Sequence, residues 1–172
     1  MQERLITRPL PAYDPARGLL HAEHFQIAYV TNDMARAEQV FRERFGVREF
    51  RSNGGANAQG GVLDVRAVWI GNTLYEILCG KGPGQELYTD HAPEDGPFVL
   101  RLHHLGYLVR DEADWDKLEE AVARGGWTVR SRSTASGLVK ALHVELPDFG
   151  HMAEFVLAYP HFRQVLEGTP VA

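Results

Sequence analysis

The sequence predicts an α+β fold made of two tandem βαβββ modules. A short apolar run followed by a helix signal occurs once in each half of the chain. Three matched pairs share one offset of 78 residues (104 − 26, 107 − 29 and 111 − 33): Gln26 with His104, Tyr29 with Tyr107, and Asp33 with Asp111. This constant offset indicates that the second half of the chain repeats the first.

The first module, residues 23–80, begins with an apolar run at residues 27–30 that is typical of a strand. Asp33 then provides a helix N-cap signal, and Gly46 marks the end of the helix. Three strands are expected to follow, at residues 50–51, 62–70 and 74–78. The Gly- and Asn-rich stretch at residues 52–61 is interpreted as a mobile loop that forms a long solvated hairpin connection, with a lid as the alternative.

The second module, residues 101–159, repeats this order. Its helix has Trp115, Leu118 and Val122 at helical spacing and ends at Gly125 and Gly126. Strands are expected at residues 105–109, 128–132, 139–146 and 152–157. The remaining segments are an N-terminal arm at residues 1–22, a linker at 81–100 and a C-terminal tail at 160–172 with a short helix at 162–166.

The composition is that of a globular protein and excludes several classes. The chain has 172 residues, of which 44% are hydrophobic and 24% charged, which argues against a disordered chain or a coiled coil. Cys79 is the single cysteine, so an internal disulfide or a thiolate zinc site is excluded and a cytoplasmic location is expected. No apolar stretch approaches the ~20 residues that span a bilayer, and the dispersed basic residues argue against nucleic-acid binding.

Two acidic residues stand at equivalent positions inside apolar strands, because Glu76 and Glu154 are also 78 residues apart (154 − 76). A buried carboxylate needs compensation for its charge, and a bound cation is one compensation. Gln26 and His104 stand at the first strand of each module. If the two half-sheets face each other, the side chains converge, which predicts a metal site made of Gln26, Glu76, His104 and Glu154.

This donor set is hard, since it offers one imidazole with three oxygen donors. Such a set favours a divalent ion with open coordination positions, and Zn, Ni, Co, Mn and Mg all remain candidates. Among the other histidines, His103 is expected to point to the face opposite His104 and to be structural. His143 and His151 fall on strands near the expected cleft. They are interpreted as donors that orient a metal ligand or bind a substrate oxygen.

The paired modules, with a ligand on each first strand and a Glu on each last strand, resemble the vicinal oxygen chelate superfamily. That superfamily includes glyoxalase I, methylmalonyl-CoA epimerase and the extradiol dioxygenases. Each first-strand ligand stands seven residues before an Asp, as Gln26 does before Asp33. The resemblance implies a curved, partly open mixed sheet around a central cleft. The order Gln, Glu, His, Glu is similar to the metal set of the eukaryotic type of glyoxalase I.

The resemblance implies an enzyme, namely a metal-dependent, glyoxalase-like isomerase, epimerase or lyase. In such enzymes the metal polarises a carbonyl group, an enolate forms, and a liganding carboxylate moves the adjacent proton, which here assigns catalysis to Glu154 and Glu76. Two departures matter. Val30 stands where glutathione-dependent glyoxalases usually have Arg, which argues against glutathione. Gln26 breaks the two-His, one-carboxylate triad of extradiol dioxygenases, unless His24, two residues upstream, replaces it as a ligand.

Two further functions stay open beside the favoured one. The first is a metal-free small-molecule binding protein of the drug-sequestering type, although the retained carboxylates argue against it. The second is an extradiol-type dioxygenase. In each case the expected partner is a small molecule, and the edge strand left open by each half-sheet predicts a homodimer.

Overall fold

The computed structural model describes residues 21–135 and 137–172. The N-terminal arm expected at residues 1–22 lies outside this range except for its last two residues. The described part forms one eight-stranded mixed sheet and four α-helices, in agreement with the predicted α+β class. None of these helices is long and apolar enough to cross a lipid bilayer.

The order of elements is βαβββ twice. The first module contains β1 (Glu23–Thr31), α1 (Met34–Phe45), β2 (Arg51–Ala56), β3 (Val62–Ile70) and β4 (Thr73–Lys81). The second contains β5 (Leu100–Val109), α3 (Glu112–Gly125), β6 (Val129–Ala135), β7 (Val139–Leu146) and β8 (His151–Ala158). A short helix α2 (Glu86–Thr89) lies between the modules, and α4 (Pro160–Glu167) follows β8.

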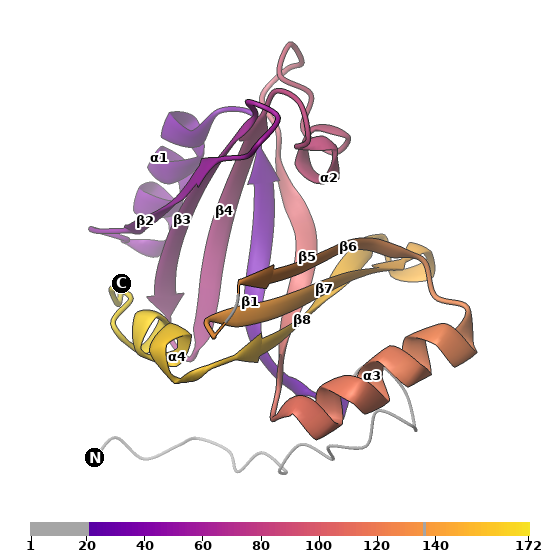
Figure 1. Ribbon diagram of the computed structural model, residues 1–172. Coiled ribbons are helices and arrows are strands. Elements are labelled where there is room, and N and C mark those ends of the chain that lie inside the picture. Colours follow the sequence, from indigo (N-terminus) through magenta and orange to yellow (C-terminus); the bar gives the residue numbers. More distant parts are fainter. Residues whose placement is uncertain (1–20, 136) are drawn as a thin grey trace, which may run out of the picture.

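The first strands of the two modules lie at the centre of the sheet. The strand order is β2-β3-β4-β1-β5-β8-β7-β6. β1 and β5 pair antiparallel at the seam between the modules, and the last strand of each module pairs parallel with its first strand. Figure 1 shows β6, β7 and β8 crossing in front of β1 and β5, because the sheet curls into a half-barrel around a central cleft.

The two long helices begin and end at the residues that the sequence signals predict. Asp33 and Asp111 are the N-caps of α1 and α3, and each carboxylate accepts a hydrogen bond from a backbone N–H three residues further on. Gly46 and Gly126 follow these helices with φ angles of 68° and 64°, a left-handed conformation that costs glycine little.

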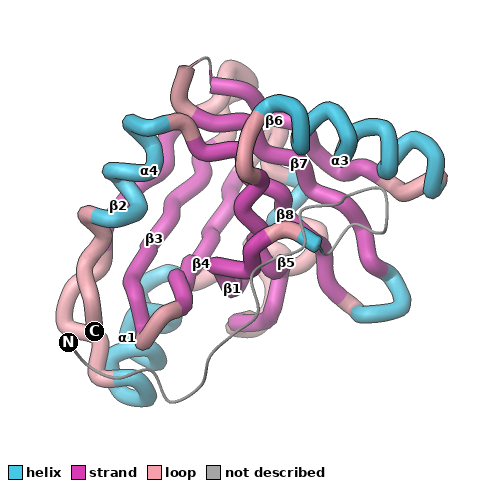
Figure 2. The backbone as a smooth tube through the Cα atoms, turned by 90° about the horizontal axis from the view of Figure 1, so that it is seen from below, coloured by secondary structure: helices cyan, strands magenta, loops and turns pink. Residues whose placement is uncertain are grey.

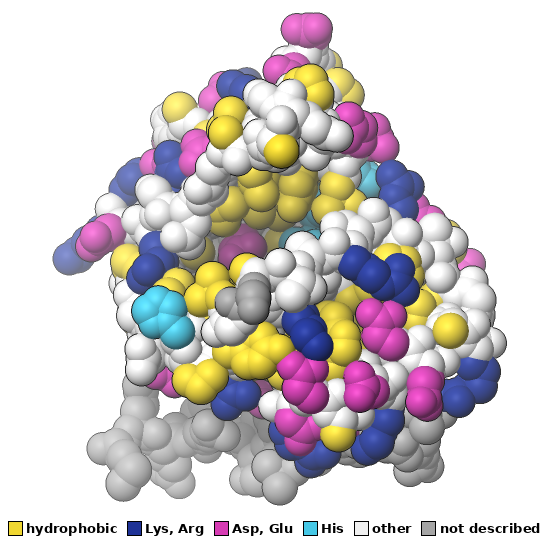
Figure 3. Space-filling model, in the orientation of Figure 1, with side chains coloured by type: hydrophobic (Ala, Val, Ile, Leu, Met, Phe, Trp, Pro, Cys, Tyr) yellow, Lys and Arg dark blue, Asp and Glu magenta, His cyan; other side chains and the backbone are white. Residues whose placement is uncertain are grey.

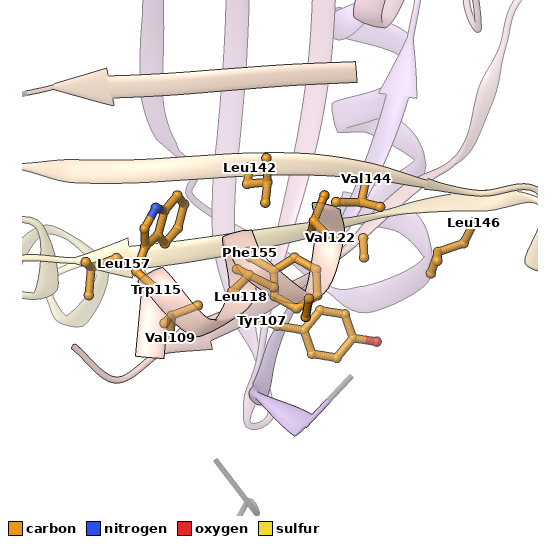
Figure 4. Close-up of a cluster of buried hydrophobic side chains, with 12 residues drawn as sticks. Tyr107, Val109, Trp115, Leu118, Val122, Leu142, Val144, Leu146, Phe155 and Leu157 are labelled. Atoms are coloured by element: carbon orange, nitrogen blue, oxygen red, sulfur yellow. The ribbon is translucent and has the colours of Figure 1, made fainter. Parts of the chain in front are cut away.

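Helices α1 and α3 cover the outer face of the sheet. On the second module, Trp115, Leu118 and Val122 of α3 pack against Tyr107 and Phe155, as Figure 4 shows. Helix α1 packs in the same way on the first module. Seen from below, α1, α3 and α4 lie around the strands (Figure 2). Each module therefore has its own apolar core on the helix side, and the inner face of the sheet is left for other contacts.

The inner face of the sheet is covered at its two ends. At one end, Leu166 of α4 packs in an apolar cluster with Phe25 and Leu74. At the other end, Tyr88 of α2 packs in a cluster with Leu78. The stretch of inner face between these two apolar clusters holds the polar side chains described below.

Two segments differ from the sequence-based expectation. A mobile loop is predicted at residues 52–61, whereas residues 51–56 form the edge strand β2, which pairs antiparallel with β3. The side chains of β2 are mostly exposed, so backbone hydrogen bonds hold it and no apolar alternation marks it. The expected linker at residues 81–100 carries α2, whose four residues are too few to show helical periodicity.

Candidate metal centre

The four side chains predicted as ligands meet on the inner face of the sheet. They come from its four central strands: Gln26 from β1, Glu76 from β4, His104 from β5 and Glu154 from β8. Nε2 of Gln26 lies 2.8 Å from Oε2 of Glu76 and 3.3 Å from Nε2 of His104. Nε2 of His104 in turn lies 3.2 Å from Oε2 of Glu154. The four residues form one continuous polar cluster within a single chain.

Two β-bulges change which neighbours of these residues reach the cluster. In the β1–β5 pair, Phe25 is an extra residue on β1 and His103 is an extra residue on β5. The bulge at Phe25 puts His24 opposite Tyr107, whose ring centroid is 5.4 Å away, so His24 does not share the face of Gln26. His24 is exposed and lies away from the cluster, which contradicts its expected place beside Gln26.

The second bulge brings His103 to the cluster. Nδ1 of His103 lies 2.9 Å from Nδ1 of His104, whereas strand alternation predicts that the two rings point to opposite faces. That prediction is wrong because the extra residue interrupts the alternation.

Gly106 provides the space that Gln26 occupies. These two residues are paired across the β1–β5 seam. A Cβ atom at position 106 would lie 2.7 Å from Cβ of Gln26 and 3.1 Å from Cε1 of Phe25. Glycine at this position therefore lets the Gln26 side chain lie flat over the neighbouring strand.

We expect Gly106→Ala to displace Gln26 and to lower the free energy of unfolding by about 1–3 kcal/mol, the usual effect of overpacking. Urea unfolding of the metal-free protein measures this change. Gly55→Ala is the matched control, because a Cβ atom at position 55 meets nothing within 4 Å. If both variants unfold at the wild-type urea concentration, Gly106 does not set the position of Gln26.

His143 on β7 is a further polar group of the cluster. One ligand atom each from His104, His143 and Glu154 lies within 4.8 Å of the others. Nε2 of His143 is 3.6 Å from Oε1 of Glu154, and both ring nitrogens are buried without a hydrogen-bond partner. The sequence placed His143 near the cleft, but its contact with Glu154 depends on the register of β7 against β8. His151 lies at the start of β8, where Nδ1 contacts the backbone carbonyl of Met152.

The cluster fits a divalent cation. Two carboxylates lie among imidazoles, and among the described residues Glu76 and Glu154 have no ion pair with Lys or Arg. The unpartnered nitrogens of His143 leave lone pairs or protons that cost free energy when buried. Imidazole and carboxylate donors together suit Zn, Co, Ni and Mn.

The two carboxylates of the cluster have different acidities in the metal-free protein. Burial and the charge of Glu154 raise the pKa of Glu76 to about 7. Burial would also raise the pKa of Glu154, but the adjacent His104 and His143 outweigh this effect and lower it to about 2. Burial is the main reason that the pKa of His143 is lowered to about 4 and that of His103 to about 3. His103 and His143 are therefore neutral at pH 7.

The acidity of Glu76 predicts how the stability of the metal-free protein changes with pH. The pKa rises from 4.5 to about 7 on folding, so in this interval the folded protein holds a proton that the unfolded chain has released. The free energy of unfolding should therefore fall as pH rises from about 4.5 to 7, by up to ~3 kcal/mol at about 1.4 kcal/mol per unit. Urea unfolding at several pH values measures this slope. Glu76→Gln should flatten it, and an equal slope in the variant would contradict the assignment.

The face of the molecule seen in Figure 3 has an open hollow. Figure 3 shows this hollow with apolar walls and with acidic and histidine side chains at its depth. A separate pocket of about 340 Å³ lies beside α4 and is lined in part by Phe25, Trp69, Leu108 and Arg163. None of the described residues that line this pocket belongs to the polar cluster.

Comparisons with known proteins bear on the fold. No family model matches the sequence, and no curated protein matches it. Among solved structures, the chain is similar to a variant of Streptomyces coelicolor methylmalonyl-CoA epimerase in complex with 2-nitronate-propionyl-CoA. The identity is 16%, the match covers 81% of this chain and 96% of that one, and the TM-score is 0.57. It is also similar to the methylmalonyl-CoA epimerase from Mycobacterium tuberculosis, with 14% identity, coverage of 85% and 93%, and a TM-score of 0.54.

These epimerases are members of the vicinal oxygen chelate superfamily. The chain has the vicinal oxygen chelate fold. The predicted pairing of two βαβββ modules around a central cleft is thereby confirmed. At 14–16% identity the likeness concerns the vicinal oxygen chelate fold alone.

Proposed function

We propose that this protein is a metal-dependent, glyoxalase-like isomerase, epimerase or lyase that acts on a small carbonyl compound through an enolate. The observation that carries the proposal is the convergence of two carboxylates, one amide and one imidazole from four neighbouring strands. Methylmalonyl-CoA epimerases have the same fold, which makes an epimerase the first reaction to test.

The residues proposed to hold the ion are Gln26, Glu76, His104 and Glu154. His143 lies close enough to Glu154 to add a fifth donor or to bind a substrate oxygen. A divalent ion in this site would supply Lewis-acid polarisation of a carbonyl group, which makes the proton on the adjacent carbon easier to remove.

The two carboxylates are proposed to carry protons. Glu76 belongs to the first module and Glu154 to the second, and the paired strands β1 and β5 lie between their strands. A substrate held over this pair would have one carboxylate on each side. One carboxylate could then remove a proton from carbon while the other returns a proton to the opposite face, which is what an epimerisation requires.

Solvent deuterium exchange tests this proposal. With Co²⁺ or Zn²⁺ added, we expect methylmalonyl-CoA, as the first test compound, to take up deuterium at the carbon next to its carbonyl groups. Glu76→Gln and Glu154→Gln should each lower the exchange rate by about 10²–10⁴-fold, the usual worth of a positioned acid or base. Glu145→Gln on β7, whose carboxylate pairs with Arg130 at 2.7 Å, should exchange at the wild-type rate.

Exchange at an unchanged rate in both carboxylate variants would overturn the assigned roles. If the protein binds the metal but methylmalonyl-CoA takes up no deuterium, methylmalonyl-CoA is not the substrate and other carbonyl compounds are tested next. If the protein binds no metal, the metal-free binding protein is the remaining candidate.

One observation favours a second candidate, an extradiol-type dioxygenase. His104, His143 and Glu154 together form a set of two imidazoles and one carboxylate, which is the donor set of many Fe(II) oxygenases. Oxygen consumption with catechol and added Fe(II) separates the two candidates, because enolate chemistry consumes no oxygen.

A further inference from the structure

His103 makes two buried hydrogen-bonding contacts, one with each ring nitrogen. Its Nε2 lies 2.9 Å from the backbone carbonyl oxygen of Leu87 in α2. Its Nδ1 lies 2.9 Å from Nδ1 of His104. Both histidines are 2% exposed, so water does not compete for these contacts.

The Leu87 carbonyl determines which ring nitrogen donates and which accepts in both hydrogen bonds of His103. A carbonyl oxygen only accepts, so Nε2 of His103 carries a proton and donates it to Leu87. A neutral imidazole has a single N–H, so Nδ1 of His103 is left with a lone pair. The short contact with His104 then needs a proton from the other ring, which places a proton on Nδ1 of His104.

The opposite arrangement would require a charged His103. For His103 to donate to both neighbours it would have to be an imidazolium ion, buried beside His104 and with the rings of His91 and His143 at 5.4 and 6.4 Å. No carboxylate contacts His103 among the described residues, so this charge would be uncompensated. An unpaired buried charge costs several kcal/mol, so the neutral form of His103 is favoured.

We infer that His103 is a positioning residue that holds a proton on Nδ1 of His104 and so leaves Nε2 of His104 as the nitrogen that binds the ion. The Gln26 side agrees, because the amide nitrogen of Gln26 is a donor and lies 3.3 Å from Nε2 of His104, which can accept from it. Nε2 of His104 also lies 3.2 Å from Oε2 of Glu154, the other proposed ligand. The inference rests on the proposed metal site and adds a role for α2, whose Leu87 carbonyl begins the chain of hydrogen bonds.

Side-chain ¹⁵N NMR of the metal-free wild-type protein tests the inference directly. We expect His103 to carry its proton on Nε2 and His104 to carry one on Nδ1. This result is expected whether or not Nε2 of His104 is also protonated toward Glu154. A protonated Nδ1 on His103, or an unprotonated Nδ1 on His104, would overturn the inference.

Two variants of His103 provide a second test. His103→Gln keeps one donor for Leu87 and one acceptor for His104, so Co²⁺ should bind within a few-fold of the wild-type affinity. His103→Leu keeps neither, which frees His104 to place its proton on Nε2 and donate it to Glu154. Its Co²⁺ affinity should fall by about 10–100-fold. Equal losses in both variants, or no loss in His103→Leu, would contradict the positioning role.

The two measurements separate this inference from the proposed function. If the wild-type protein binds no Co²⁺, the metal-dependent function fails, whereas the NMR measurement needs no ion and still reports the tautomer. If the wild-type protein binds Co²⁺ but the proton lies on the wrong nitrogen, only the role of His103 fails. Should His103→Leu not fold, the wild-type NMR spectrum and His103→Gln still decide the outcome.

Discussion

Replacing Glu154 by Gln is expected to abolish the binding of the divalent ion proposed for this site, for which we expect one ion per wild-type chain. Glu154 lies 3.2 Å from His104 and 3.6 Å from His143, so its negative charge would offset the positive charge of an ion held beside these imidazoles. The neutral amide keeps the shape of the side chain but removes the negative charge from a buried site. We expect the affinity for Co²⁺ or Zn²⁺ to fall about 100-fold or more, since even residues behind the ligands are worth 10–100-fold.

Metal content by elemental mass spectrometry and Co²⁺ titration measure this effect. Glu145→Gln is the matched control, because it removes one carboxylate from the adjacent strand β7, where the partner is Arg130 at the surface. The control should bind the ion with wild-type affinity. Retention of one ion per chain by Glu154→Gln would rule out Glu154 as a ligand.

The second large effect is expected in the core behind the site. Phe155 is fully buried, packs between α3 and the sheet, and its ring lies 5.6 Å from that of Tyr107. Truncation to Ala removes most of a buried aromatic side chain and leaves a cavity. We expect Phe155→Ala to lower the free energy of unfolding by about 3–5 kcal/mol, a large part of the 5–15 kcal/mol that holds a typical domain folded.

Urea unfolding measures this loss, and Phe149→Ala provides the control. Phe149 is 66% exposed, so the same truncation there should change stability by less than about 0.5 kcal/mol. Equal effects of the two truncations would contradict the placement of Phe155 in the core.

The sequence predicts those elements of the fold that are specified by the side chains of their own residues. The two long helices have an Asp cap, an apolar stripe and a final Gly, and all three features are local. The edge strand β2 has no such signal, because backbone hydrogen bonds to β3 hold its Gly and Asn residues. Helix α2 is a single turn and is equally invisible to periodicity.

The candidate site shows where strand alternation stops being a sufficient guide. The 78-residue offset brings Glu76 and Glu154 to equivalent strands, and the structure places both in one cluster with Gln26 and His104. Both errors, at His24 and at His103, arise from single extra residues in the β1–β5 pair. A β-bulge depends on how two strands meet, which a single strand's sequence does not reveal.

An ion bound in the proposed site would also link the two modules across the seam between β1 and β5. Each module supplies only two of the four proposed ligands, so the ion would act as a cross-link between halves of the chain. A link from Gln26 to Glu154 closes a loop of 128 residues (154 − 26). Cross-links that close long loops remove the most conformational entropy from the unfolded chain. The ion would therefore also stabilise the folded arrangement of the two modules.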